Sequence, residues 1–313
     1  MINRELIRLK VVQLIYAYYR SERTEESLDN AEKELFFSFD KSYELYLYLL
    51  NALLQLKKVA ESKEETRLAR ATRLGQSTEG VYAEKMFAEN KFLCQLDLNE
   101  TLVDYREKQK KEWIEEDAFY KKLYATMVES DIYQLYLAKE DFSYDADREI
   151  VRKLYKTFID GNEDFDTLLE DHGLYWNDDK FLIDSFVLKT IKKFNPEAGA
   201  GQPLLPQFSM EEDREFASAL FRETIKRKED IKELISQNCK NWEYDRLAFM
   251  DVIIMQIAIT EILTFPSIPL SVTFNEYLDI AKVYSTPRSA SYINGLMDHV
   301  VKRLKAEGKL MKA

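Results

Sequence analysis

The feature that most constrains this chain is that its first proline is Pro196, although the chain has 313 residues. Only 8 Gly and 6 Pro occur in all. Proline breaks helices, and tight β-turns depend on Gly and Pro, so a long segment without proline favours helices over sheets. Charged residues make up 32% of the chain and aromatic residues 13%, which is typical of amphipathic helices that pack through large side chains. We therefore predict an all-α fold.

Half of the prolines lie in one segment, NPEAGAGQPLLPQ, from Asn195 to Gln207. This composition is typical of a linker. We expect an N-terminal helical region over residues 1–194, a Pro/Gly linker over 195–208 and a helical domain over 209–306. In that last domain the apolar periodicity predicts four helices, over residues 210–236, 244–263, 270–284 and 289–304.

The charge of the chain is unevenly distributed. Its formal net charge of −11 opposes binding to nucleic-acid phosphates, which requires Lys and Arg. However, both ends of the chain are basic, and the acidity is concentrated in the middle. Residues 160–179 contain eight Asp or Glu and no Lys or Arg. This pattern indicates an acidic insert within a basic frame.

Several classes of protein are disfavoured by the sequence. The longest nearly apolar run, Val252 to Phe265, is shorter than the roughly 20 residues of a membrane-spanning helix. The N-terminus lacks the apolar core of a secretory signal. Cys94 and Cys239 are too few for a disulfide framework and are interpreted as free thiols in a reducing compartment. We therefore expect a cytoplasmic protein without a membrane span.

No motif of an active site or a cofactor site was found. His172 and His299 do not have the spacing of metal ligands. Gly199 and Gly201 lie in the linker rather than between a strand and a helix, so we interpret them as hinge residues and not as a phosphate cradle. There is no nucleophile elbow and no plausible Cys–His pair. We expect no enzyme activity, no cofactor and no metal.

The chain resembles itself when it is shifted by 66 residues. Nine of thirty ungapped positions are then identical, including residues 147–149 on 213–215 and Trp176 on Trp242. Two explanations are open: a duplicated helical unit, or two amphipathic helices that share a period.

Residues 245–304 contain three linked motifs. The first ends in Thr260-Glu261-Ile262, the second begins Ile268-Pro269-Leu270, and the third contains Ser289 and Tyr292-Ile293-Asn294-Gly295. Together they resemble the C-terminal signature of the NusB family. The resemblance covers residues 209–306 and also residues 3–20, where Val11-Val12-Gln13-Leu14-Ile15-Tyr16 resembles the first helix of the family. It implies a NusB-like helical bundle at the C-terminus with an additional N-terminal helical region.

The resemblance also implies a function. NusB-type proteins are non-enzymatic transcription antitermination factors. They bind boxA-like single-stranded RNA of rRNA operons with the ribosomal protein NusE, within the RNA polymerase antitermination complex. Arg4 and Arg8 match an arginine cluster of the family, while Glu5 and Leu6 replace two of its arginines. The candidate RNA contacts are Arg4, Arg8, Lys10, Tyr16, Lys282, Arg288, Ser289, Asn294 and Lys302.

Each of these features also has a purely structural interpretation. Charged residues on helices commonly form a solvated face. Asn275, Glu276 and Asn294 are suited to satisfying helix ends or buried polar groups, and Gly295 suggests the close approach of another backbone. The alternative function is a helical protein–protein interaction scaffold with vestigial RNA binding, in which the acidic N-terminal half docks a basic partner. Gln256, where the family usually has Arg, favours that alternative.

Overall fold

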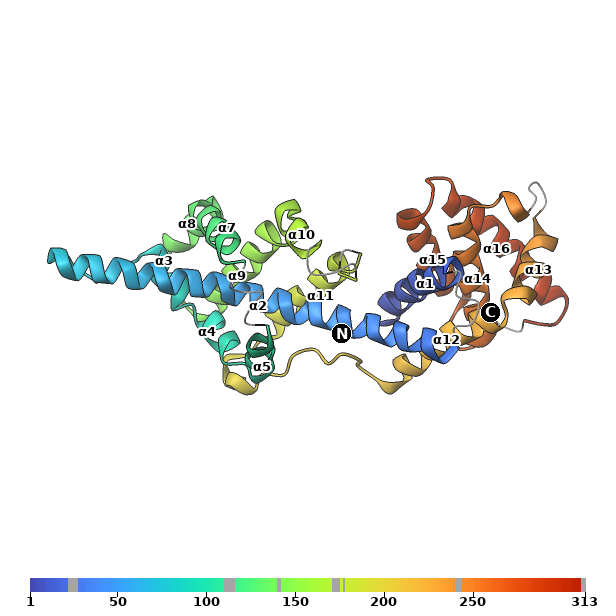
Figure 1. Cartoon of the computed structure of the whole chain (residues 1–313), viewed down its shortest axis with the longest axis horizontal. Coiled ribbons are helices and arrows are strands. Elements are labelled where there is room, and N and C mark those ends of the chain that lie inside the picture. The colour runs from blue at the N-terminus through green and yellow to red at the C-terminus, as the bar shows by residue number, and fades with distance from the viewer. Residues whose placement is uncertain are drawn as a thin grey trace. The chain divides into compact units, whose positions relative to one another are not determined.

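The computed structural model describes residues 1–21, 28–109, 116–139, 142–170, 175–176, 178–239 and 244–310 (Figure 1). Within these residues the chain is helical, and the only β-type pairing is an isolated bridge between Ile2 and Phe208. The predicted all-α fold is confirmed. The chain forms two compact units: unit 1 contains residues 1–40 and 207–313, and unit 2 contains residues 41–206.

Unit 1 combines the two ends of the chain. Its helices are α1 (Arg4–Arg20), the first part of α2 (Leu28–Leu74), α12 (Glu211–Lys226), α13 (Lys228–Asn238), the 3₁₀ helix η2 (Tyr244–Arg246), α14 (Phe249–Thr264), α15 (Leu270–Tyr284) and α16 (Ser289–Ala306). This division differs from the predicted regions 1–194 and 209–306, because α1 packs against α12, α14 and α15. Its apolar residues are buried there: Leu6, Ile7, Val11 and Ile15 are all inaccessible to solvent.

The centre of unit 1 is α14, in which all ten residues from Ile253 to Ile262 are buried. A helix that is apolar on every side is stable only when other helices surround it. Helices α1, α12, α13, α15 and α16 all contact α14. The helix ends at Thr264, before Phe265-Pro266, as expected for a residue pair that disfavours helical backbone.

The four predicted helices of this domain agree with the structure in part. The prediction for residues 270–284 is confirmed by α15, and α16 extends the prediction for 289–304 by two residues. The prediction for 210–236 was wrong in one respect, because the helix is interrupted at Arg227 and continues as α13. The helix predicted from Tyr244 begins instead at Phe249, after η2.

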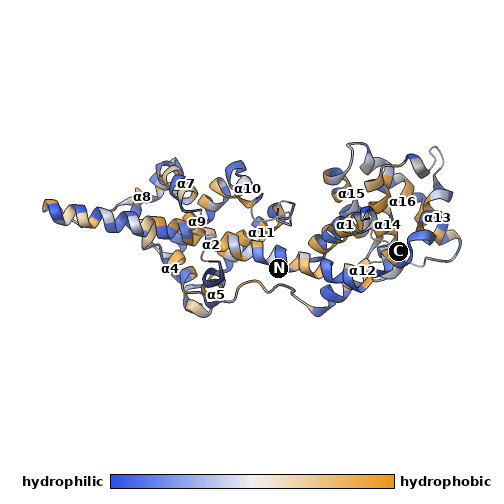
Figure 2. Cartoon of the chain, in the orientation of Figure 1, coloured by the Kyte–Doolittle hydropathy of each residue, from blue (hydrophilic) through white to orange (hydrophobic). Residues whose placement is uncertain are grey.

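Unit 2 is built on the remainder of α2, along which hydrophobic and hydrophilic residues alternate (Figure 2). Its other helices are α3 (Ala83–Ala88), α4 (Lys91–Asp97), α5 (Glu100–Lys108), α7 (Asp117–Glu129), α8 (Asp131–Leu137), α9 (Tyr144–Phe158), α10 (Glu163–Glu170), α11 (Lys180–Lys193) and the 3₁₀ helix η1 (Pro196–Gly201). The expected linker includes η1 and is bound to unit 2. The Gln95 side chain donates hydrogen bonds to the carbonyl oxygens of Asn195 and Gly199, at 2.8 and 2.9 Å.

The self-resemblance at a shift of 66 residues has a counterpart in the structure. Adding 66 to the bounds of α9, α10 and α11 gives 210–224, 229–236 and 246–259, each within five residues of the bounds of α12, α13 and α14. The buried Asp147 accepts a hydrogen bond from the backbone N–H of Lys91, the first residue of α4, at 2.7 Å. Its counterpart Asp213 pairs with Arg4, the first residue of α1, at 3.4 Å. The corresponding helix bounds favour a duplicated helical unit over a shared period, although the two aspartates have different donors, a backbone N–H and a guanidinium. Trp242, the partner of Trp176, lies outside the described residues.

Candidate nucleic-acid interface

Arg8 does not lie on a solvated face. Its side chain is 3% exposed, and Nε and Nη2 donate to the two carboxylate oxygens of Glu261 on α14, at 2.8 and 3.0 Å. Glu261 is fully buried. This paired geometry suits the planar guanidinium. The expectation that Arg8 contacts RNA is therefore corrected: the guanidinium faces the interior and joins α1 to α14.

The ion pair belongs to a larger buried network that includes α15. Thr273 Oγ1 and Tyr277 OH donate to the Glu261 carboxylate at 2.7 and 3.1 Å, and Glu276 lies 3.3 Å from Arg8. Burial alone would lower the pKa of Arg8, but the hydrogen bonds and charge of Glu261 outweigh it and raise that pKa above its ordinary value. Burial, followed by the charge of Glu261, raises the pKa of Tyr277 well above its usual range. Glu276 therefore has the structural role expected from its position.

Two more candidate contacts are also buried. Lys10 is 1% exposed and Ser289 is 4% exposed, so in this conformation neither side chain can reach a ligand. Ser289 Oγ donates to Asp251 Oδ2 at 2.8 Å. Both residues therefore act in the fold, and the expectation of direct contact is corrected for them as well.

Ser289 is part of a network that holds the loop between α15 and α16. Asp251 on α14 accepts hydrogen bonds from both Ser285 and Ser289, and Thr286 Oγ1 lies 2.8 Å from Ser289 Oγ. Arg288, the residue before α16, is exposed. It forms no ion pair with any residue that the structure describes. The loop therefore presents a cation that has no acidic partner among the described residues, on a backbone that Asp251 holds.

The remaining candidate contacts are accessible to different degrees. Arg4 has a side chain 42% exposed, pairs with Asp213 at 3.4 Å and lies over the ring of Phe216. Asn294 is exposed. Lys282 and Lys302 are exposed but pair with Asp279 and Asp298 on their own helices, at 2.6 and 2.7 Å. These three ion pairs reduce the positive charge that Arg4, Lys282 and Lys302 offer to a phosphate.

The structure brings together a surface at the C-terminal part of α1, which we call the Tyr16 surface. It consists of Gln13, Tyr16, Arg20, Phe249 and Tyr284. The rings of Tyr16 and Phe249 lie 5.5 Å apart, and the Arg20 guanidinium lies over both, 5.7 and 5.2 Å from the ring centroids. Gln13 donates to the hydroxyl of Tyr284 at 3.3 Å, beside the loop that carries Arg288. Phe249 is 39% exposed, and Arg20 is also exposed.

Sequence reasoning missed Arg20 and Phe249 as members of this surface. Arg20 follows Tyr16 by four residues, which places both on one face of a helix, so the sequence contained a signal for that pair. No comparable signal marks Phe249, because its contact with α1 is formed only in the folded chain. Arg4 and Arg20 are separated by about 24 Å along α1, at 1.5 Å per residue. They therefore mark opposite ends of the helix.

Two residues of the third motif, Tyr292 and Gly295, lie on α16. Tyr292 has its hydroxyl 3.7 Å from Cys239 Sγ, and burial raises its pKa. The expected close approach of another backbone at Gly295 was wrong, because a Cβ built there would meet no atom within 4 Å. Gly295 lies on the exposed side of α16.

Among the described residues there is no cluster of His, Cys, Asp or Glu suited to a metal ion. His172 lies outside the described residues. None of the helices in the described parts of the chain combines the length and apolar character needed to cross a membrane.

Comparisons with known proteins converge on one family. Residues 187–302 match the model of the NusB family. A relative from Salinibacter ruber, named transcription antitermination protein NusB, is 37% identical over 132 residues, covering 40% of this chain and 82% of the relative. A relative of the same name from Koribacter versatilis is 41% identical over 99 residues, covering 32% and 68%. Among solved structures, T. maritima NusB matches with 27% identity and a TM-score of 0.30, covering 40% of this chain and 87% of that chain.

Proposed function

This chain belongs to the NusB family, and on that basis we propose that it is a non-enzymatic transcription antitermination factor. In this proposal it binds boxA-like single-stranded RNA of rRNA operons with NusE, within the RNA polymerase antitermination complex. The relatives that match it carry the name of such a factor. Its place would then be the cytoplasm, where RNA polymerase acts on the DNA of bacteria such as these relatives.

The observation that best supports RNA as the ligand is the Tyr16 surface. Single-stranded RNA is held mainly by stacking of bases on aromatic rings and by cations along the backbone. The Tyr16 surface offers two rings with a guanidinium over them. Arg288 supplies a second cation from the neighbouring loop. A protein of negative net charge can therefore present a local site with the chemistry that RNA requires, because the potential at the site depends more on nearby charges than on the net charge of the chain.

The candidate residues divide into two roles in this proposal. Exposed or half-exposed side chains contact RNA, and buried ones position the helices that carry them. The first group is Arg4, Tyr16, Lys282, Arg288, Asn294 and Lys302, joined by Arg20 and Phe249. The second group is Arg8, Lys10 and Ser289.

Titration of a labelled boxA RNA, with and without NusE, tests the proposal. We expect Phe249→Ala to weaken binding about fivefold or more, since stacking contributes about 1–3 kcal/mol per base. Arg20→Glu and Arg288→Glu should each weaken binding and reduce its salt dependence. Arg70→Glu, an equal charge change at an exposed position of α2 in unit 2, is the matched control. Equal losses in all three charge variants would contradict a local site, and unchanged affinity in all variants would contradict RNA binding at this surface.

A further inference from the structure

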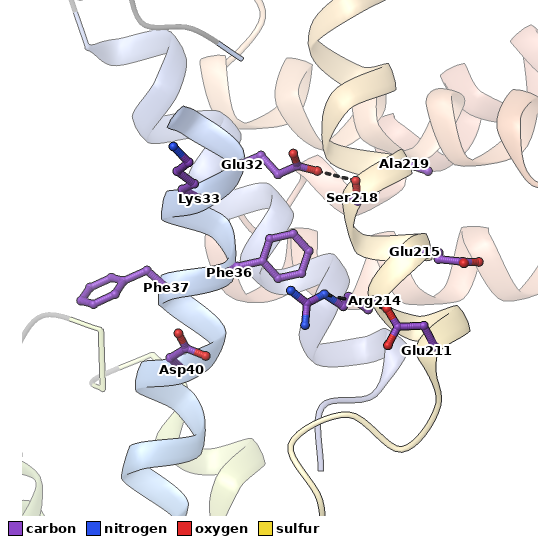
Figure 3. A pocket seen from close by; sticks show the side chains of 10 residues that line it. All are labelled: Glu32, Lys33, Phe36, Phe37, Asp40, Glu211, Arg214, Glu215, Ser218 and Ala219. Atoms are coloured by element: carbon purple, nitrogen blue, oxygen red, sulfur yellow. Dashed lines mark hydrogen bonds and ion pairs between the residues drawn. The ribbon is translucent and has the colours of Figure 1, made fainter. Parts of the chain in front are cut away.

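A second surface of unit 1 is acidic, and none of the residues that line it is a proposed RNA contact. An open groove of about 660 Å³ lies between the first part of α2 and α12 (Figure 3). Phe36 extends from α2 towards Arg214 of α12, while Asp40 lies one turn further along α2. We call it the acidic groove. Every residue that lines it belongs to unit 1.

The apolar part of the groove is held by the fold. The ring of Phe36 packs against Phe39 and Phe208, with centroids 6.0 and 6.5 Å apart. Phe39 is fully buried. Phe37, beside it, is 47% exposed, and Met210, just before α12, is 57% exposed. An apolar side chain of a partner would therefore meet the Phe36 ring, whose position is set by packing within unit 1.

The charges around the groove select the kind of partner. The residues that line the groove include four carboxylates and two cations, a net charge of −2: Glu32, Asp40, Glu211 and Glu215 against Lys33 and Arg214. The acids in the first turn of α12 interact favourably with the positive end of the helix dipole, which explains their position. Asp40 and Glu215 lie outside that turn, so the dipole does not explain them. Glu215 is exposed and has no ion pair among the described residues. Such a potential repels nucleic-acid phosphates and attracts Lys and Arg.

One cation moderates this potential at the apolar part of the groove. The guanidinium of Arg214 lies 4.8 Å from the centroid of the Phe36 ring, and its nearest carboxylate, Glu211, is 4.0 Å away. Both the charge and the position of Arg214 oppose a basic partner. Its side chain is 54% exposed, so it can move aside at little cost.

We propose that the acidic groove docks a basic amphipathic segment of a partner protein, with an apolar side chain against Phe36 and Phe37 and Lys or Arg beside Asp40 and Glu215. The acidic groove and the Tyr16 surface have no residue in common, so in this proposal a partner and RNA can be bound together. The proposal does not depend on RNA binding.

The test uses the full chain and a labelled helical peptide of Lys and Leu at amphipathic spacing. Its counterpart has Glu in place of every Lys. We expect the Lys peptide to bind and the Glu peptide not to bind. Phe37→Ser and Glu215→Lys should each weaken binding of the Lys peptide about fivefold. Arg214→Ala should strengthen it about threefold, because it removes a like charge and uncovers Phe36.

Matched controls separate docking from general attraction to an acidic protein. Leu135→Ser removes a side chain that is 69% exposed on α8, and Glu107→Lys reverses an exposed charge on α5. Both should change affinity less than twofold. Equal losses in variants and controls, or equal binding of the Glu peptide, would overturn the proposal. BoxA RNA affinity should be unchanged in Phe37→Ser, so failure of this proposal is distinguishable from failure of the RNA site.

Discussion

Replacement of Arg8 by Met gives the most informative test of unit 1. Met retains much of the volume of the side chain but removes the charge and both hydrogen bonds to Glu261. The Glu261 carboxylate would then stay fully buried, with only Thr273 and Tyr277 as donors. Removal of one partner of a buried ion pair costs about 3–5 kcal/mol. We expect unit 1 to lose that much of its free energy of unfolding, a large part of the roughly 5–15 kcal/mol typical of a domain.

The loss should be reversible by a second substitution. Glu261→Gln removes the charge that Arg8→Met leaves unpaired, and an amide oxygen can still accept from Thr273 or Tyr277. The double variant should therefore be more stable than Arg8→Met alone, because the main penalty comes from the isolated charge and not from the lost bond. The changes in free energy of unfolding for two side chains in direct contact do not simply add, and here the second substitution should offset part of the loss caused by the first.

Hydrogen exchange followed by mass spectrometry of α1, α14 and α15 peptides measures unit 1 separately from unit 2. A single denaturation curve would combine the two units and has no simple two-state meaning. A loss below about 1 kcal/mol in Arg8→Met, or a double variant less stable than the single one, would refute a buried structural role. The same reasoning excludes Arg8→Glu as a test of RNA contact, because it would place two carboxylates together in the core.

Three further outcomes are expected. Asp251→Ala should speed hydrogen exchange in the loop between α15 and α16 and weaken boxA RNA binding although Arg288 is retained; unchanged exchange would show that Asp251 does not hold the loop. In unit 2, burial raises the pKa of Asp184 to about 6, despite the nearby Lys180. Because this carboxyl pKa is higher in the folded chain than in the unfolded chain, the free energy of unfolding is larger below about pH 4 and decreases as pH rises through about 6, by at most about 3 kcal/mol. A carboxyl NMR titration with its midpoint below pH 4.5 would contradict this. Burial also raises the pKa of the Cys94 thiol, so its alkylation at pH 8 should be slower in the folded chain than in urea, and equal rates would contradict it.

Helix content could be predicted from the sequence because it depends on local features. The absence of proline before Pro196 and the periodic apolar residues were enough to predict the all-α fold, and the bounds of α15 were correct. The break at Arg227 was missed because neither Gly nor Pro marks it. The start of α14 at Phe249 was also missed, since the 3₁₀ turn before it depends on packing.

The candidate site was predictable only in part, for a related reason. Periodicity correctly places Arg4 and Arg8 one turn apart, but it cannot show whether that face is covered. The residue that buries Arg8 is Glu261, 253 positions later in the chain. Tyr16 and Phe249 meet in the same way across a long sequence separation. Contacts of this kind arise from tertiary packing, so only the folded structure reveals them.

The composition of unit 1 from residues 1–40 and 207–313 has a consequence for synthesis on the ribosome. Helix α1 emerges before α12, α14 and α15, which bury its apolar residues, because the 166 residues of unit 2 lie between them. At roughly 5–20 residues per second, the interval between the end of α1 and the end of α15 is on the order of 10–50 seconds. During that interval Ile7, Val11 and Ile15 have no native partners, which makes the nascent segment a natural ligand for chaperones.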